Sequence, residues 1–204
     1  MSSNPSDEYL TIKSLVRDKI KIESSIFIAT AVPVDSEETA QEWIQRISRE
    51  FHDATHNCYA WRVKDHRKEI EKYGDAGEPR GTAGKPILSA IESEELHNVL
   101  VVVTRYYGGI KLGTGGLSRA YRSSAQDALK KAKKITGWIT SDIKLSYPVN
   151  MTGKVQLVFS KYGVRTLDSS FDEQAEVKIQ IRSSWSDRLK KALIEATNGQ
   201  VKFK

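Results

Sequence analysis

An uninterrupted apolar run, Val99–Val103, constrains the fold of this chain more than any other feature of its sequence. Together with the residues up to Tyr106 it predicts a strand at the centre of a sheet, because a strand covered on both faces is apolar throughout. A glycine-rich turn, Gly108–Gly116, follows, and the apolar spacing of residues 117–134 predicts a helix. The run is far shorter than the ~20 residues that a membrane-spanning helix needs. We therefore expect a sheet built around this strand and no membrane segment.

The composition excludes several classes of protein. The chain has 204 residues, of which 39% are hydrophobic, so it can form one large or two small domains with a real core. This hydrophobic share excludes wholesale disorder. The single cysteine excludes a secreted module held by internal disulfides. We see no basic segment followed by an apolar one after Met1, so we expect no export signal and a cytoplasmic location.

The net charge of +6 permits a polyanionic partner without demanding one. Up to Thr136 the chain has 21 basic and 19 acidic residues, a balance of +2. After Thr136 it has 11 basic and 7 acidic residues, a balance of +4. The smaller C-terminal part is therefore the more basic one per residue.

The region before the apolar strand is predicted to begin with a hairpin and a helix. Residues 20–34 contain two β-rich pieces with a turn around Glu23–Ser25. Ser36 is a good N-cap, and the apolar residues from Ala40 to Phe51 recur at helical spacing. His56–Val63 is predicted to be a strand, whereas the polar residues 64–86 are predicted to form one long loop.

The C-terminal part has the pattern of a second, compact domain. Thr136-Gly137 is predicted to stop the preceding helix, and we place a boundary there. The elements predicted after it are a strand, a helix, two strands, a helix and a strand, over residues 143–149, 154–162, 164–171, 175–181, 186–196 and 201–203. This β-α-β-β-α-β order is that of the ferredoxin-like unit.

The first segment that could bind a ligand is Asp75–Pro86. Its glycines allow positive φ or a close approach to a partner, and successive backbone N–H groups in such a loop can form an anion-binding concavity. The alternative is a surface loop whose glycines only serve its turns. The candidate anion- or RNA-binding residues of this segment are Gly77, Glu78, Arg80, Gly81, Thr82, Gly84 and Lys85.

The second segment, residues 105–119, runs from strand through glycine-rich turn to helix. The amino end of a helix favours a phosphate, basic residues supply charge, and tyrosines could stack on bases. The dinucleotide fingerprint lacks its third glycine here, and the Gly-Lys-Ser/Thr of a P-loop is missing. Anion binding and a purely structural strand–helix connection both stay open. The candidates are Arg105, Tyr106, Tyr107, Gly108, Gly109, Lys111, Gly113, Gly115, Gly116 and Arg119.

A third cluster, residues 52–58, superficially resembles a metal or Cys/His catalytic site. A tetrahedral zinc site would need further ligands, and the remaining histidines have no supporting cysteines. A lone cysteine in a strand, such as Cys58, is usually a small buried hydrophobe. We note His56 and Cys58 as motif residues and predict no metal, no cofactor and no catalytic residue.

In three stretches the sequence resembles the IMPACT family, in particular its bacterial, two-domain YigZ-like branch. The stretches are Ala54–Trp61, Asp75–Pro86 and Arg105–Tyr121. Together they cover roughly residues 10–135 as one domain, and the C-terminal pattern matches the second domain of this branch. Ala76 departs from the family, in which many members have Asp or Asn at this position. A charged loop is therefore less strongly indicated for this chain.

The resemblance implies an α+β fold of two domains. Residues 1–136 would form a ribosomal-protein-type α/β sandwich with a left-handed β-α-β crossover. Residues 137–204 would form a ferredoxin-like domain similar to the last domain of elongation factor G. The eukaryotic relatives regulate translation through a partner domain that is absent here, and the family has no established catalytic residues to transfer.

Three functions remain open from the sequence. The first, which we favour, is a non-catalytic translation regulator that binds the ribosome, structured RNA or a protein partner in translation control. The second is an enzyme or binding protein for a phosphorylated small molecule or nucleotide. The third is a protein–protein interaction module that needs no anion. The sequence gives no indication of the oligomeric state, and it does not show whether the two glycine-rich segments meet.

Overall fold

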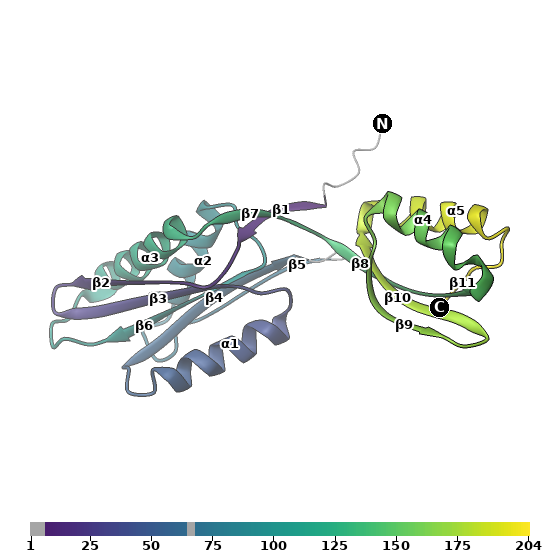
Figure 1. The fold of residues 1–204 in the computed structure, drawn as a ribbon. Helices are drawn as coiled ribbons and strands as arrows, with labels where there is room; N and C mark the ends of the chain where they lie inside the picture. Colours follow the sequence, from purple (N-terminus) through teal and green to yellow (C-terminus); the bar gives the residue numbers. More distant parts are fainter. Residues whose placement is uncertain (1–6, 65–67) are drawn as a thin grey trace. The chain divides into compact units, whose positions relative to one another are not determined.

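The computed structural model describes residues 7–64 and 68–204, and the chain divides into two compact units (Figure 1). The larger unit runs from Tyr9 to Gly137. The smaller unit comprises Trp138–Lys204 together with the described residues before Tyr9. The division falls one residue after the expected end of the first domain. In the part of the chain that is described, no helix is long and apolar enough to cross a membrane.

The larger unit contains a five-stranded antiparallel sheet in the order β2-β3-β6-β4-β5. Its strands are β2 (Val16–Ile22), β3 (Ser25–Pro33), β6 (Val99–Tyr106), β4 (His56–Lys64) and β5 (Glu69–Gly74). The first seven residues of β6 are buried, which confirms the predicted central strand. Because β3 and β4 both run antiparallel to β6, they are parallel to each other and form a β-α-β crossover.

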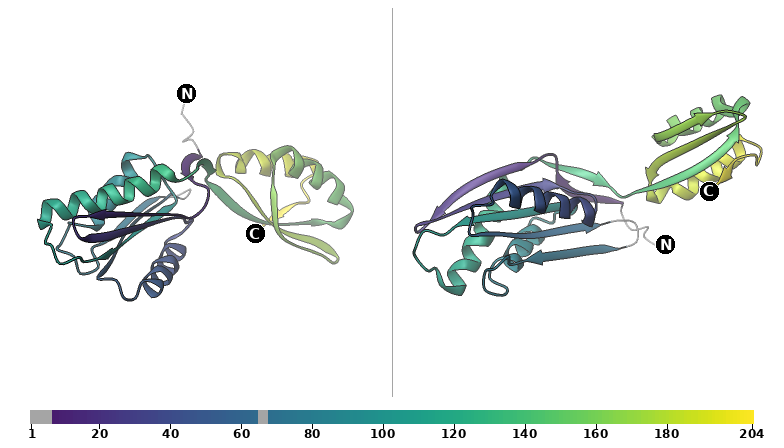
Figure 2. Two further views of the ribbon diagram at one scale, coloured as in Figure 1. Left: turned by 60° about the vertical axis from the view of Figure 1, so that its left-hand side comes forward. Right: turned by 90° about the horizontal axis from the view of Figure 1, so that it is seen from below.

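Helices cover both faces of this sheet (Figures 1 and 2). Helix α1 (Glu37–Glu50) packs on one face, and Ser36 caps it as predicted by accepting a hydrogen bond from the backbone N–H of Thr39. Helices α2 (Gly84–Ser93) and α3 (Gly113–Lys131) pack on the other face. The predicted α/β sandwich is therefore confirmed, with a separate hydrophobic core on each side of the sheet.

The prediction of one long loop over residues 64–86 is wrong. Residues 65–67 lie outside the described part of the chain, but β5 occupies Glu69–Gly74 and α2 begins at Gly84. β5 is an edge strand whose residues are mostly exposed, so it needs no apolar face that a sequence pattern could reveal. The start of α2 has no side-chain cap from Ala83, the residue before it, so the usual local signal is missing.

The prediction that Thr136-Gly137 stops a helix is also wrong. Helix α3 ends at Lys131, and the next residues form β7 (Lys134–Trp138), which pairs with β1 (Glu8–Ile12). A Cβ atom on Gly137 would lie 2.4 Å from the ring of Tyr9. This glycine therefore allows the two strands to approach and has no role in ending the helix.

The smaller unit has the predicted ferredoxin-like fold. Its elements are β8 (Thr140–Pro148), α4 (Thr152–Tyr162), β9 (Arg165–Phe171), β10 (Gln174–Arg182), α5 (Ser186–Ala196) and β11 (Lys202–Phe203). Short 3-10 turns, Val149–Met151 and Ser183–Trp185, precede the two helices. The sheet order is β11-β8-β10-β9, and both helices pack on one face of it. The predicted α+β class is confirmed for both units.

Candidate functional site

The two glycine-rich segments meet in the interior of the larger unit. The carboxylate Oε1 of Glu78, from the first segment, accepts a hydrogen bond from Arg105 Nη1 at 2.6 Å. The same oxygen accepts a second bond from the hydroxyl of Tyr121 at 2.9 Å. Glu78 is 8% exposed and Arg105 is 5% exposed, so this ion pair is largely shielded from water. The pair ties the loop before α2 to the end of β6.

Other side chains complete this buried polar cluster. Arg105 Nη2 donates to Ser25 Oγ at 3.3 Å, and its guanidinium lies 5.5 Å from the ring centre of Phe27. His56 Nε2 lies 3.9 Å from Glu78 Oε1, and His56 Nδ1 lies 2.9 Å from the carbonyl oxygen of Ala76. Among the described residues, Arg105 Nε is buried without a hydrogen-bond partner. The guanidinium is thus enclosed, and its charge is balanced by Glu78 and not by a surface anion.

Asp75 organises the first segment from its beginning. Its carboxylate accepts hydrogen bonds from the backbone N–H groups of Gly81 at 2.8 Å, Ala83 at 3.1 Å and Gly84 at 2.9 Å. Burial raises the pKa of this carboxyl, but the three backbone bonds and the charge of Arg80 outweigh burial, so its pKa is lowered overall. Asp75 therefore acts as the missing cap of α2, and the backbone N–H groups of the loop bind this internal carboxylate.

Cys58 is fully buried beside this loop. Its thiol donates a hydrogen bond to the carbonyl oxygen of Asp75 at 2.8 Å. Burial raises the pKa of the Cys58 thiol to about 12, so almost no thiolate forms at neutral pH. Within the described residues, no group of three or more His, Cys, Asp and Glu side chains could hold a metal ion.

The second segment reaches the surface after β6. Gly108 lies so close to the β2–β3 turn that a Cβ atom on it would be 1.8 Å from the carbonyl oxygen of Ser24. Only glycine allows this approach. The chain then turns into α3, whose first four residues, Gly113–Gly116, are three glycines and a threonine. The exposed amino end of α3 is therefore free of bulky side chains.

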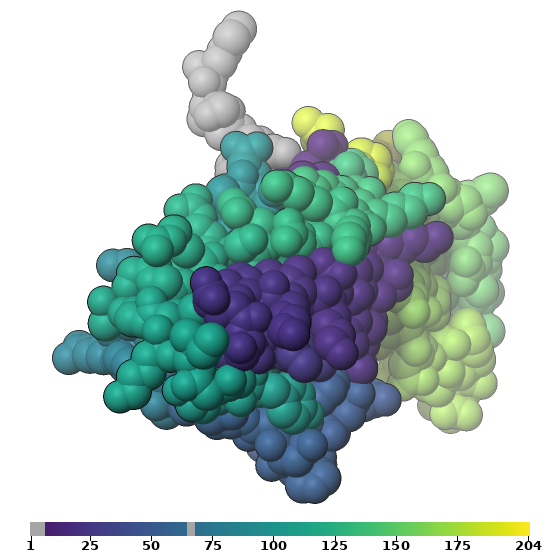
Figure 3. Space-filling model, turned by 90° about the vertical axis from the view of Figure 1, so that its left-hand side faces the viewer, coloured from purple at the N-terminus to yellow at the C-terminus, as the bar shows by residue number. Residues whose placement is uncertain are grey.

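Lys111 and Arg119 line a surface groove of about 590 Å³ at this end of the unit. Figure 3 looks onto this end, where the purple β2–β3 hairpin lies beside the teal segment that contains both residues. Both side chains are exposed, and neither has an ion-pair partner among the described residues. The other lining residues are Ile22, Glu23, Ile110, Leu112, Gly116, Ala120 and Ser123. We call this feature the Lys111–Arg119 groove.

The structure separates the sequence candidates into three groups by burial. The buried candidates are Cys58, Glu78, Thr82, Gly84 and Arg105. The partly buried ones are His56, Gly81, Tyr106 and Gly116. The exposed ones are Gly77, Arg80, Lys85, Tyr107, Gly108, Gly109, Lys111, Gly113, Gly115 and Arg119. Arg105 is the candidate whose position differs most from expectation, because its charge does not reach the surface.

Sequence reasoning missed three residues of the cluster. Asp75 stands at the start of the first segment, so the density of special residues there could have drawn attention to it. Tyr121 fits the apolar face of α3 and gives no sign that its hydroxyl binds Glu78. Ser25, at the start of β3, gives no signal in the sequence.

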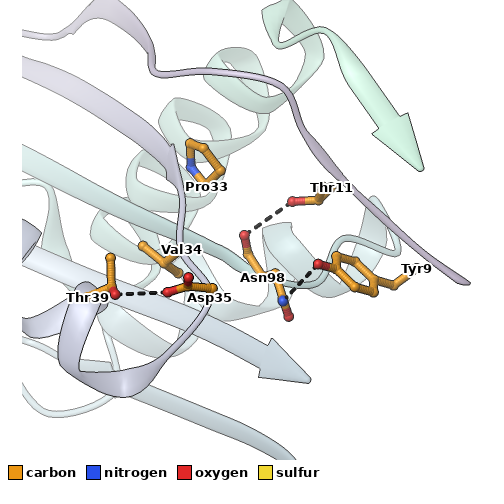
Figure 4. A pocket seen from close by; sticks show the side chains of 7 residues that line it. All are labelled: Tyr9, Thr11, Pro33, Val34, Asp35, Thr39 and Asn98. Atoms are coloured by element: carbon orange, nitrogen blue, oxygen red, sulfur yellow. Dashed lines mark hydrogen bonds between the residues drawn. The ribbon is translucent and has the colours of Figure 1, made fainter. Parts of the chain in front are cut away.

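A second pocket, of about 310 Å³, lies near Asn98 in the larger unit (Figure 4). Thr11 Oγ1 donates to the carbonyl oxygen of Asn98 at 3.1 Å, and Asn98 Nδ2 donates to the hydroxyl of Tyr9 at 3.0 Å. On the opposite side of the pocket, Thr39 Oγ1 donates to Asp35 Oδ1 at 2.9 Å. These polar groups satisfy one another, so the contacts with Asn98 hold β1 in place.

Two family models match this chain. The model of the Impact N-terminal domain covers residues 23–129, which is more than half of the chain, and that of a domain of unknown function, DUF1949, covers residues 148–200. The chain belongs to the IMPACT family. The resemblance predicted from the three sequence stretches is thereby confirmed. The buried cluster and the Lys111–Arg119 groove both lie within the Impact N-terminal domain.

Two bacterial members of the IMPACT family resemble this chain over nearly its full length. It is 33% identical to IMPACT family member YvyE of Bacillus subtilis, over 96% of this chain and 90% of YvyE. It is 34% identical to an IMPACT family member of Haemophilus influenzae, over 95% of both chains. A crystal structure described as that of a hypothetical protein has a TM-score of 0.75 and 25% identity, over 97% of this chain and 96% of the other.

The eukaryotic relatives match a smaller share of this chain than these bacterial members do. Protein IMPACT of Oryctolagus cuniculus is 37% identical over 93 residues, which are 44% of this chain and 29% of that protein.

Proposed function

We propose that this IMPACT family chain acts in the control of translation, as a cytoplasmic, non-catalytic protein that binds ribosomal RNA through the Lys111–Arg119 groove. The observation that carries the proposal is a pair of exposed cations beside the amino end of α3, neither of which forms an ion pair within the described part of the chain. The family membership supports the translation part, because the resemblance implies that eukaryotic members of the family are regulators of translation. That resemblance supplies no partner for this chain, so the partner is argued from the groove.

The chemistry of the groove suits a phosphate backbone. The amino end of a helix presents unpaired N–H groups and a partial positive charge, which favour a phosphate group. Lys111 stands just before α3 and Arg119 lies two turns into it, so both add full charges to the same end. Tyr107 is 44% exposed and lies on the same segment, where its ring could stack on an unpaired base.

The first segment supports this surface from inside. Glu78 and Arg105 fix the loop against the strand from which the second segment starts. The raised pKa keeps the Cys58 thiol protonated, so it is a poor nucleophile. The carboxylate of Glu78 is already paired with Arg105, so it is not free for acid–base chemistry. We therefore propose that the buried cluster around Glu78 and Arg105 has a structural role and that RNA binds to the Lys111–Arg119 groove.

The smaller unit contributes less to the proposed surface. Its open sheet face has four lysines, but Lys178 pairs with Asp142 at 2.9 Å and Lys204 with Glu176 at 2.5 Å. These ion pairs reduce the net charge that the face offers to a polyanion. We expect this unit to strengthen binding through general charge and not to select the site.

Co-sedimentation with purified ribosomes and subunits, at low and raised salt, tests the proposal. We expect saturable binding to one particle that weakens steeply with salt, because bound phosphates release counterions. The double variant Lys111→Glu/Arg119→Glu should lose most of this binding. As a matched control, Lys130→Glu reverses another exposed charge about three turns further along α3 and should bind nearly as the wild type does.

A phosphorylated small molecule is the second candidate, because the same groove presents the same cations. A panel of nucleotides and sugar phosphates in a thermal-shift assay separates the two. Saturable stabilisation by one compound, lost in the double variant, together with no ribosome binding, would replace our proposal with this one. If the protein binds neither ribosomes nor any phosphorylated compound, the proposal is contradicted, and the remaining function is that of a protein–protein interaction module.

A further inference from the structure

Helix α1 is shorter than the sheet that it covers in the larger unit (Figures 1 and 2). Its last residue, Glu50, accepts two hydrogen bonds from Arg17 of β2, at 2.6 and 2.9 Å, and the ring centre of Phe51 lies 4.9 Å from the same guanidinium. Arg17 also donates to Thr30 Oγ1 of β3 at 3.0 Å. The helix therefore ends level with Arg17 and Thr30, and the sheet continues for two further rows of side chains before the β2–β3 turn.

The strand register gives the residues of these two rows. In an antiparallel pair, opposite side chains share one face of the sheet, and so do alternate side chains of one strand. The register is continuous from β2 to β3 and from β3 to β6. The two rows are Lys19, Ile28 and Thr104, and then Lys21, Ile26 and Tyr106. Thr104 is buried, and we call the other five residues, which are exposed or partly exposed, the Tyr106 face.

Tyr106 stands on the central strand β6, and its ring is held in place. Its hydroxyl donates a hydrogen bond to Asp53 Oδ1 at 2.7 Å. Asp53 lies in the segment that follows α1, which a second bond anchors, from Asn57 Nδ2 to the carbonyl oxygen of Phe51 at 3.2 Å. A ring that is already fixed loses little conformational freedom when a flat ligand stacks on it.

Lys19 and Lys21 stand on the edge strand β2 of the same face. Both are exposed, and neither forms an ion pair with a described residue, whereas Arg17 on the same face is paired with Glu50. Neighbouring strands lie about 4.8 Å apart, so the backbone of Lys21 is about 10 Å from that of Tyr106. A lysine side chain spans much of this distance, so the two ammonium groups flank the ring.

We propose that the Tyr106 face binds a single-stranded stretch of RNA, with a base stacked on Tyr106 and phosphates held by Lys19 and Lys21. This inference rests on the proposed function and adds that the RNA is unpaired where it crosses the face. An aromatic ring on an open sheet, flanked by cations, suits unpaired bases, whereas a base inside a duplex cannot reach the ring. The Lys111–Arg119 groove borders the same β2–β3 turn through Glu23, so one strand can contact both surfaces.

A protein partner fits this face less well. Ile26 and Ile28 are only partly exposed, so the face offers little apolar area to another protein. Lysine is depleted at protein–protein interfaces, and here two lysines border the ring. Cations beside an aromatic ring are instead typical of surfaces that bind single-stranded nucleic acid.

Fluorescence anisotropy of the full chain with two RNA probes tests the role of Tyr106. The probes are a labelled oligouridine of about 16 nucleotides and the same strand annealed to oligoadenosine. Tyr106→Leu should weaken binding of the single strand at least about fivefold, because the stacking surface is lost, and should change binding of the duplex less than about twofold. The matched control Tyr106→Phe keeps the ring and loses only the bond to Asp53, so it should bind the single strand nearly as the wild type does.

The salt dependence of oligouridine binding tests the two lysines. For Lys19→Gln/Lys21→Gln, the slope of log affinity against log salt should be smaller than that of the wild type by about 1.4, because two phosphate contacts to a single strand are lost. Tyr106→Leu removes no charge and should keep the wild-type slope. The control Lys130→Gln/Lys133→Gln removes two other exposed lysines and should also keep it. Circular dichroism of every variant confirms that it is folded before its binding is interpreted.

Each outcome decides the inference separately from the proposed function. No binding of oligouridine by the wild type at low salt overturns the inference and leaves the face for a protein partner. Normal binding of oligouridine by Tyr106→Leu, or an unchanged slope for Lys19→Gln/Lys21→Gln, also overturns it. If ribosome binding still depends on Lys111 and Arg119 in these cases, the proposed function stands. If oligouridine binding depends on Tyr106 but no ribosomal particle is bound, the Tyr106 face stands and the ribosomal target is wrong.

Discussion

The two glycine-rich segments have similar compositions and opposite environments. In Asp75–Pro86 the two carboxylates bind groups within the unit: Asp75 binds backbone N–H groups, and Glu78 binds Arg105 and Tyr121. In the segment after β6 the cations face outward, and Lys111 and Arg119 line a groove. The difference teaches that glycine-rich, charged sequence does not by itself mark a binding loop. What separates the two is whether the chain supplies its own counter-charge.

The largest expected effect concerns access to the interior of the first segment. Because burial raises the pKa of Cys58 to about 12, its reaction with a thiol reagent at pH 8 should be at least about a thousandfold slower in the folded chain than in guanidinium chloride. Cys58 is the single cysteine, so the absorbance of the released chromophore reports this thiol alone. Equal reaction rates of Cys58 in the folded chain and in guanidinium chloride would show that solvent and reagent reach the buried cluster.

Removing the internal counter-charge should destabilise the protein strongly. Glu78→Ala leaves the buried guanidinium of Arg105 unpaired, so we expect a loss of about 3–5 kcal/mol in the free energy of unfolding. Chemical denaturation measures this loss. A loss below about 1 kcal/mol would mean that water reaches Arg105 readily and that the Glu78–Arg105 ion pair contributes little to stability.

Asp75 should have a smaller effect that depends on pH. Asp75→Ala removes three hydrogen bonds at the start of α2 and should cost about 1–2 kcal/mol at neutral pH. The folded-state pKa of Asp75 is lowered from 3.8, so its stabilisation is present above about pH 4 and is lost as the pH falls through the folded pKa. The wild type should therefore lose stability more steeply than Asp75→Ala in this acid range. Parallel pH profiles would contradict the cap assignment.

The second segment should tolerate loss of its charges. Lys111→Ala and Arg119→Ala remove exposed cations that form no ion pair with any described residue, so each should change the free energy of unfolding by less than about 0.5 kcal/mol. The same denaturation experiment provides the measurement, with Glu78→Ala as the contrasting variant. A loss as large as that of Glu78→Ala would show that both segments are structural.

Local signals in the sequence predicted much of the fold. The apolar run of β6, the cap at Ser36 and the β-α-β-β-α-β order were all readable, because each depends on neighbouring residues. The edge strand β5 was missed because an exposed strand needs no apolar face. Helix α2 was missed because its capping carboxylate, Asp75, stands nine residues before Gly84. The local pattern at Gly137 gave a wrong prediction of a helix end. That glycine allows close packing against Tyr9, which lies far away in the sequence.

The candidate site was predictable as two segments but not as one arrangement. Composition could not show that Arg105 is enclosed, because its partner Glu78 lies 27 residues earlier in the sequence. The exposure of Lys111 and Arg119 depends on how α3 packs on the sheet, which no local pattern encodes. Long-range pairing is thus what decides which charges remain free for a ligand.

The salt dependence of binding to purified ribosomal subunits tests the central claim most directly, namely that the second segment supplies the binding charges. For Lys111→Ala/Arg119→Ala, the slope of log affinity against log salt should be smaller than that of the wild type by about 1.5, as the loss of two phosphate contacts requires. The control variant Lys130→Ala should keep the wild-type slope. Equal slopes for the double variant and the wild type would contradict the account.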